Sequence, residues 1–188
     1  MYDGHNRIFW GILICSFNIN LGYINILPNF AGYLLIVSGL NVLYKESSLD
    51  MFQKIGTMGM IVALLSFMGG AMNIFTGGLN NYFFVNLLWM MGFIVLELIF
   101  FFKVLESSIE YLDQNNYEDI KEIYIEKLRN YTILSLVSAA LMVISFTFNL
   151  EKYFIMSAFS GLIVEVYLMT IIYGLRNEFK DPEFGEEE

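Results

Sequence analysis

Long apolar blocks alternate with short polar connections along most of this chain. Four blocks plainly reach the length of about 20 residues needed by a transmembrane helix: 55–75, 82–102, 131–150 and 153–173. A fifth block, 28–44, is slightly short, but it begins at Pro28, which suits a first helical turn, and it is followed by the charged Lys45 and Glu46. The pattern therefore predicts at least five membrane-spanning helices.

The sixth candidate span, residues 8–27, is interrupted. Its apolar beginning predicts a half-helix of about 15 Å, roughly half of the hydrocarbon core. The polar stretch "FNINLGYINILPNFAGY" (17–33) follows, and it opens with the two-residue alternation of an extended segment. Extended backbone facing lipid would leave its N–H and C=O groups unpaired. We therefore predict a discontinuous or re-entrant first crossing that is buried in protein or lines a wet cavity.

The asparagines of this stretch are candidate ligand-binding residues, because interrupted spans often present amides and free backbone dipoles to a ligand. A second interpretation is that 17–27 is an external loop whose asparagines cap helices and form turns. The sequence leaves both interpretations open. The four candidate residues are Asn18, Asn20, Asn25 and Asn29.

Basic residues predict the orientation. If successive connections alternate between the two sides, every Lys and Arg except Lys152 falls on one side, which the positive-inside rule assigns to the cytoplasm. The expected fold is an all-α integral membrane protein, a six-crossing helical bundle of the cell membrane with both termini cytoplasmic. We expect one transmembrane domain over 1–180, with a helical cytoplasmic connection at 106–130, and an acidic tail at 181–188. The connection either lines the floor of the bundle or docks a partner protein.

Two acidic residues interrupt otherwise apolar spans. Glu97 lies in 82–102 and Glu165 in 153–173, and an ionised acid at a helix centre costs about 2.5–3.5 kcal/mol. Glu165 is a candidate ligand-binding residue, and both acids are candidates for proton or cation coupling. The alternative is a neutral carboxyl that joins two helices through a hydrogen bond.

Small residues four positions apart predict close contact between helices, because lipid provides no hydrophobic drive for helix association. Four such pairs are Gly59 with Ala63, Ser66 with Gly70, Ser135 with Ala139, and Ser157 with Gly161.

Composition agrees with a membrane protein, since 57% of residues are hydrophobic and 15% charged. The net charge of −9 argues against a nucleic-acid partner, which leaves the lipid bilayer and another membrane or cytoplasmic subunit. With Cys15 and His5 as the sole residues of their types, zinc and haem ligand sets are not expected, and no phosphate-binding loop is present. We expect no metal, no cofactor, no catalytic residue and no enzymatic activity.

Residues 7–40 resemble the N-terminal part of small uncharacterised bacterial multispan membrane proteins, in which an apolar half-span precedes a polar stretch and an I-L-P-x-F-x-G-Y segment. In that pattern Asp commonly stands at the positions of Asn25 and Asn29. The layout is also similar to the S components of energy-coupling-factor transporters, which have six helices, cytoplasmic termini and a non-helical segment after the first helix. Residues 8–17 lack the Ala-x-x-x-Ala docking motif of that family.

The leading functional hypothesis is a small-molecule binding or transport subunit with its site at the broken first crossing. The contrasting hypothesis is a structural or regulatory membrane subunit that acts by protein–protein contact. A polar cavity that reaches Asn20, Asn25 or Glu165 favours the first. A solid core without a cavity favours the second.

Overall fold

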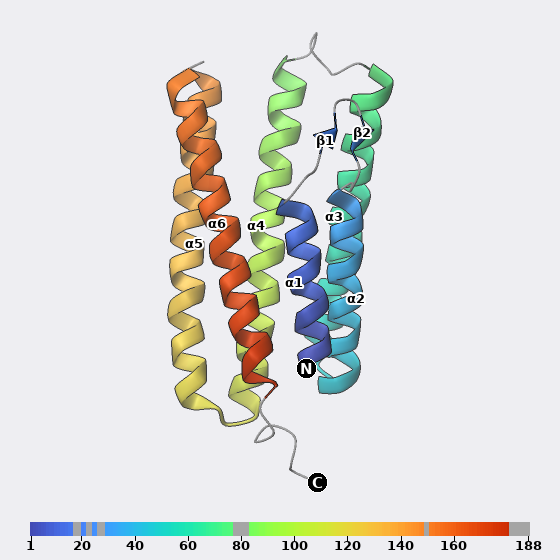
Figure 1. Ribbon diagram of the computed structural model, residues 1–188, viewed down its shortest axis with the longest axis vertical. Helices are drawn as coiled ribbons and strands as arrows, with labels where there is room; N and C mark the ends of the chain where they lie inside the picture. Colours follow the sequence, from blue (N-terminus) through green and yellow to red (C-terminus); the bar gives the residue numbers. More distant parts are fainter. Residues whose placement is uncertain (17–19, 22–23, 26–28, 77–82, 149–150, 181–188) are drawn as a thin grey trace.

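The chain folds into an all-α bundle (Figure 1). The computed structural model describes residues 1–16, 20–21, 24–25, 29–76, 83–148 and 151–180. The predicted acidic tail, 181–188, lies outside the described residues. The helices are α1 (Tyr2–Ser16), α2 (Asn29–Ser47), α3 (Asp50–Thr76), α4 (Phe83–Gln114), α5 (Glu118–Thr147) and α6 (Glu151–Glu178), with short strands β1 (Asn20–Leu21) and β2 (Ile24–Asn25).

Among the described residues, four helices are long and apolar enough to cross a membrane, namely α3, α4, α5 and α6. The other two are shorter. With 15 residues α1 is about 22 Å long, which is less than a hydrocarbon core of about 30 Å. The predicted all-α fold is therefore confirmed, and four of its helices have the length and apolar character of a membrane span. The six predicted crossings stay a prediction.

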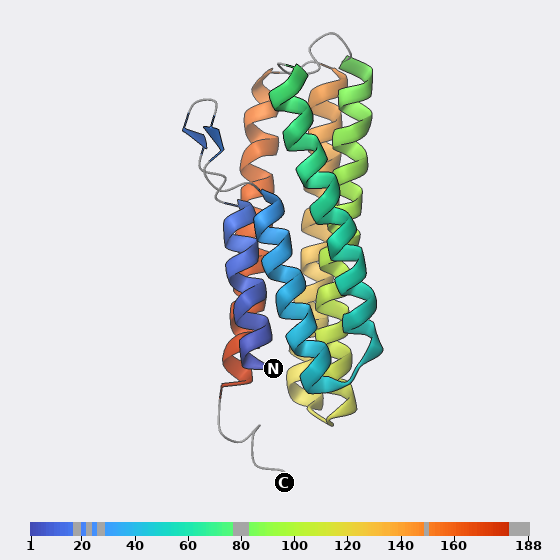
Figure 2. The same ribbon diagram turned by 90° about the vertical axis from the view of Figure 1, so that its right-hand side faces the viewer.

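The six helices are arranged as a closed ring. Each helix packs against the next one along the chain, and α6 packs back against α1. The start of α1 and the ends of α2, α4 and α6 lie at the same end of the bundle (Figures 1 and 2). Because α1 and α2 extend along only part of the longer helices, one half of the bundle contains six helices and the other half four.

The helix break in the first candidate span follows Ser16, next to the predicted end of the half-helix. However, α1 begins at Tyr2, six residues before the predicted start at Ile8. Beyond it, β1 and β2 pair antiparallel, with Asn20 opposite Asn25. Part of the polar stretch therefore satisfies its backbone groups locally, as an extended segment near lipid must do.

Glycines allow α1 and α2 to touch along their backbones. A Cβ atom on Gly11 would lie 2.7 Å from the Gly32 carbonyl oxygen, and one on Gly39 would lie 2.6 Å from the Gly4 carbonyl oxygen. Gly4 and Gly11 are seven residues apart, as are Gly32 and Gly39, which is two helical turns and keeps each pair on one face. The contact is reciprocal, since Cβ atoms on Gly4 and Gly32 would also meet the opposing carbonyl oxygens.

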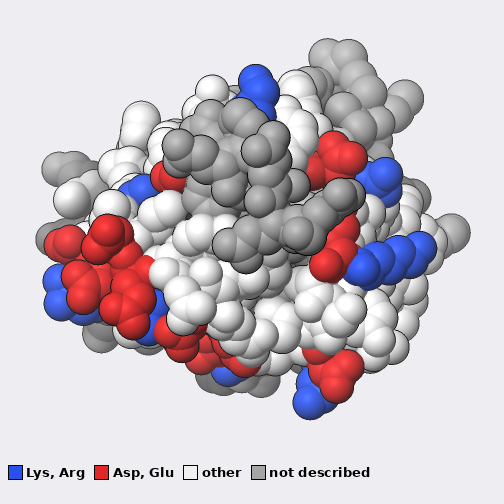
Figure 3. All heavy atoms as spheres, turned by 90° about the horizontal axis from the view of Figure 1, so that it is seen from below, with Lys and Arg blue, Asp and Glu red and all other residues white. Residues whose placement is uncertain are grey.

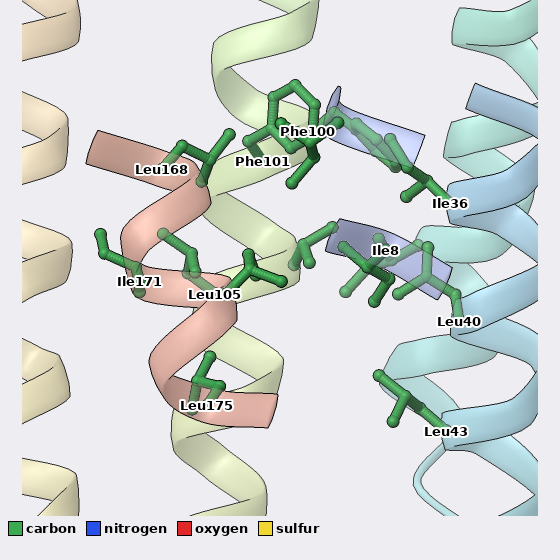
Figure 4. Close-up of a cluster of buried hydrophobic side chains, with 14 of the residues drawn as sticks. Ile8, Ile36, Leu40, Leu43, Phe100, Phe101, Leu105, Leu168, Ile171 and Leu175 are labelled. Carbon is green, nitrogen blue, oxygen red and sulfur yellow. The ribbon is translucent and has the colours of Figure 1, made fainter. Parts of the chain in front are cut away.

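The buried core occupies the half of the bundle that contains all six helices. Ile8 on α1 and Leu40 on α2 are fully buried, as are Leu105 on α4 and Ile171 on α6, and all four belong to this core (Figure 4). Every fully buried large side chain among the described residues belongs to this half. The short hairpin of α1 and α2 thus supplies one side of the core.

The segment 106–130, expected to be a helical connection, consists of the end of α4 and the beginning of α5. The two helices are separated only by residues 115–117, where Asn116 adopts a left-handed conformation with φ of 60°. Tyr124 and Tyr131 are buried, whereas Ile123 is exposed to the outside. Accordingly, α5 runs without a break from the polar end of the bundle into the predicted span.

His5 is fully buried at the polar end, where α1 begins. Its Nδ1 lies 3.0 Å from the Met1 carbonyl oxygen and its Nε2 lies 3.1 Å from Ser108 Oγ on α4. A carbonyl can only accept, so Nδ1 carries the proton and donates it to this bond. The Ser108 hydroxyl lies within hydrogen-bonding distance of both Nε2 and the Val104 carbonyl oxygen. The ring also stacks on Phe179, with centroids 5.0 Å apart. Burial lowers the pKa of His5 to about 4.

The glycine contact leads to a test of the hairpin. We expect Gly11→Ala to lower the free energy of unfolding by about 2 kcal/mol, because the added methyl group must push two helix backbones apart. Gly92→Ala is the matched control, since a Cβ at Gly92 meets no atom within 4 Å. Unfolding of the purified protein in mixed micelles, followed by circular dichroism, measures the difference. Equal stability of the two variants would contradict the contact.

His5 leads to a pH prediction. The folded protein keeps this ring neutral down to a pKa of about 4, while the unfolded chain binds a proton near pH 6.5. Stability contributed by this site is therefore present above about pH 6.5 and is lost as the pH falls towards 4, by up to roughly 3 kcal/mol. Unfolding curves between pH 7.5 and about 4.5 measure the slope. A His5→Gln variant with the same slope would show that another group is responsible.

Candidate functional site

A cavity occupies the part of the bundle interior that α1 and α2 do not fill. Its volume is about 620 Å³, and it lies between α4, α5 and α6. α4 and α6 both pack against α5, and these three helices form the walls of the cavity, which is partly open to its surroundings. Its lining includes Trp89, Phe93, Glu97 and Phe101 on α4, Tyr131, Ser135, Ser138 and Ala139 on α5, and Ser157, Gly161 and Glu165 on α6.

The two acids of the predicted spans lie at the same depth of the bundle. Glu97 is fourteen residues after Phe83, the first residue of α4, and Glu165 is fourteen residues after Glu151, the first residue of α6. Both helices run in the same direction (Figure 1), so each acid is about 21 Å below the start of its helix. Both line the cavity, so two acids that are far apart in the sequence belong to one site.

The inner end of the α1–α2 hairpin reaches both acids. Tyr33, near the start of α2, donates a hydrogen bond from Oη to Glu97 Oε1 at 2.5 Å. Ser16, the last residue of α1, lies near Glu165, and its hydroxyl donates a hydrogen bond to the Ile12 carbonyl oxygen. Tyr33 is held by its own burial and by edge contacts with the rings of Phe93 and Phe100. Glu97 is therefore contacted from α2, and Glu165 lies near the end of α1.

Hydroxyl groups make up most of the remaining polar lining. Ser138 Oγ and Ser160 Oγ lie 2.9 Å apart and join α5 to α6. Ser135 is only 7% exposed and has no hydrogen-bond partner of good geometry among the described residues, although the Tyr131 hydroxyl is close. No Lys, Arg or His belongs to the lining in the part of the chain that the structure describes.

The predicted asparagines are not brought into this cavity by any described contact. Asn18 lies outside the described residues, and of Asn20 and Asn25 only the backbone is described. Asn29 begins α2, and its Oδ1 is buried without a partner among the described residues. Its carbonyl oxygen accepts a weak hydrogen bond from Cys15 Sγ at 3.5 Å. Ligand binding by the four asparagines stays a prediction.

The small residues of the predicted pairs on α5 and α6 also line the cavity. Ser135 with Ala139, and Ser157 with Gly161, belong to its lining, and a Cβ on Gly161 would meet Ser138 Oγ on α5 at the ordinary contact distance of 3.9 Å. Their small side chains leave volume in the bundle interior. Gly59, in contrast, does allow close packing, because a Cβ there would lie 2.7 Å from Val37.

Sequence reasoning missed Tyr33 and the aromatic wall formed by Trp89, Phe93, Phe101 and Tyr131. Tyr33 belongs to the polar stretch that was singled out, but aromatic residues are frequent in every span, so nothing marked it as the partner of Glu97. The spacing of Gly4, Gly11, Gly32 and Gly39 was the available signal for the hairpin that positions it.

The described residues offer no group of three or more His, Cys, Asp or Glu side chains placed to hold a metal ion. Two carboxyl groups can instead bind a positively charged group, or exchange protons, inside an apolar chamber. The hydroxyl groups around them can accept or donate hydrogen bonds to a bound molecule.

Comparison of the chain with family models, with curated proteins and with solved structures finds no match. The resemblances to the small bacterial membrane proteins and to the transporter S components therefore gain no support and stay expectations. What can be concluded about function has to come from the cavity.

Proposed function

We propose that the chain is an integral membrane protein that binds a small molecule in the cavity between α4, α5 and α6, as a binding or transport subunit. One observation carries the proposal, namely that Glu97 and Glu165 line the same cavity of about 620 Å³. Ligand pockets in proteins commonly measure about 300–1,000 Å³ and combine apolar walls with a few polar groups. A purely structural subunit would be expected to have a solid core at this depth.

The outer surface of the long helices supports a membrane location. Large apolar side chains are exposed along α3 to α6 in numbers that a protein in water would bury. Lipid removes the free-energy cost of exposing these side chains, because lipid chains are as apolar as the side chains they cover. Examples on each helix are Ile61 and Leu64, Val95 and Ile99, Val137 and Ile144, and Ile155 and Ile163.

Charge supports an orientation with both termini in the cytoplasm. The described basic side chains lie in the half of the bundle where α1 begins, and several are visible around the rim at that end (Figure 3). By the positive-inside rule this end faces the cytoplasm. In the proposed topology α1 enters from this side and ends near the middle of the membrane. α2 then returns to the same side, so the two helices together form a re-entrant hairpin.

The contacts of Tyr33 and Ser16 give the acids a second role in this proposal. A ligand or proton that reaches Glu97 competes with the hydrogen bond that this carboxyl accepts from Tyr33. Occupancy of the cavity is thereby coupled to the position of α1 and α2. Binding of a proton or cation at the acids is in this way coupled to movement of the hairpin.

Access of water to the cavity is tested with two neighbouring alanines of α5. Ala139 lines the cavity, while Ala140 is exposed on the outside and does not. In a Cys15→Ala background, we expect Ala139→Cys to react roughly tenfold faster with a water-soluble thiol reagent than Ala140→Cys, because a thiol ionises in water and not in lipid. The reaction rates are measured with the protein in lipid vesicles.

The two variants carry the same substitution at neighbouring positions. Their unfolding curves show whether both proteins are folded to the same extent. An Ala139→Cys thiol that reacts no faster than the Ala140→Cys thiol would mean that the cavity is closed to aqueous solutes, and the proposed function would be wrong.

A further inference from the structure

The charge of the cavity points to the chemical class of its ligand. We infer that the ligand is a small organic cation, a protonated amine attached to an apolar body, whose ammonium group lies between Glu97 and Glu165. The inference rests on the proposed function and goes beyond it by naming the class of molecule. Charge balance, volume and an unpartnered hydroxyl support it independently.

Charge balance is the first argument. Glu97 accepts a hydrogen bond from Tyr33, and no basic side chain lines the cavity among the described residues. The closest basic residue along α4 is Lys103, which pairs with Glu106 outside the cavity. Carboxylates that face a mainly apolar cavity inside a membrane require a partner of opposite charge or a proton. A cationic ligand supplies that partner.

Size and wall chemistry exclude a bare inorganic ion as the best occupant. A volume of about 620 Å³ is far larger than the roughly 30 Å³ taken up by one water molecule. Around the acids stand Trp89, Phe93, Phe101 and Tyr131, whose rings attract cations through their faces and cover apolar groups. A molecule with both a charged end and an apolar body uses the acids and the aromatic wall at once.

The Ser135 hydroxyl favours an amine that carries N–H groups over a quaternary ammonium. It is more than nine-tenths buried, lines the cavity, and has no well-formed hydrogen bond among the described residues. A buried hydroxyl without a partner costs about 1–3 kcal/mol. An ammonium N–H satisfies its oxygen, whereas a methylated nitrogen does not.

Three probes of the same size and different charge test the inference: phenylbutylamine, phenylbutanol and phenylbutyrate. A Trp10→Phe variant leaves Trp89, on the cavity wall, as the one tryptophan of the chain. We expect the amine to change the Trp89 fluorescence saturably at neutral pH, with a dissociation constant roughly tenfold below that of the alcohol, which is about 1.4 kcal/mol. The carboxylate should not bind, because two acids repel it.

Variants of the acids connect this preference to the site. In the same background, Glu97→Gln and Glu165→Gln should each weaken amine binding roughly tenfold and leave alcohol binding unchanged. Glu106→Gln is the matched control on α4, and it should leave both affinities within about threefold of the parent. Unfolding curves establish that each variant is folded.

The outcomes separate the two proposals. Alcohol binding as tight as amine binding would overturn the cation inference and leave the cavity as a binding site. Binding of none of the three probes, or amine binding that both Gln variants retain, would also overturn it. The proposed function itself stands or falls with the thiol reaction rates of the Ala139→Cys and Ala140→Cys proteins.

Discussion

The backbone contact between α1 and α2 determines how the rest of the molecule is built. Glycines at Gly4, Gly11, Gly32 and Gly39 let the two helices approach until an added methyl group would overlap the opposing carbonyl oxygens. The resulting hairpin is about half as long as the bundle, and it packs on α6 at one edge and α3 at the other. The buried core lies in the half of the bundle that contains the hairpin, and the cavity lies in the other half.

The same hairpin explains how acidic groups are accommodated at mid-bundle. Tyr33 and Ser16 lie where α2 begins and α1 ends, at the depth of Glu97 and Glu165. Tyr33 donates a hydrogen bond to Glu97, and Ser16 lies near Glu165. Had α1 and α2 continued to the far end, their side chains would have occupied the cavity. The interruption of the first candidate span and the presence of the acids thus belong to one arrangement, which also leaves aromatic rings and serines facing an open interior.

The helices and the break after Ser16 were predictable because they rest on local rules. Apolar length predicts α3 to α6, and a polar stretch that alternates with period two cannot continue a helix into lipid. The site was predictable only in part. Glu97 and Glu165 stand out as charges in apolar spans. Their place in one cavity, however, depends on the parallel directions of α4 and α6 and on the equal depth of the two acids, which no local sequence pattern predicts. The serine and glycine pairs of α5 and α6 were noticed, yet the same spacing serves close packing at Gly59 and an open interior at Gly161.

The seven-residue repeat of glycines has a mechanical consequence. Two helices that interlock at points two turns apart can change register only by sliding about 10 Å, since shorter steps bring side chains against backbone. Small displacements within the pair are therefore blocked, and α1 and α2 must tilt or shift as one rigid body. A displacement of Tyr33 is then transmitted along the whole hairpin to its other end, where His5 and the N-terminus are packed.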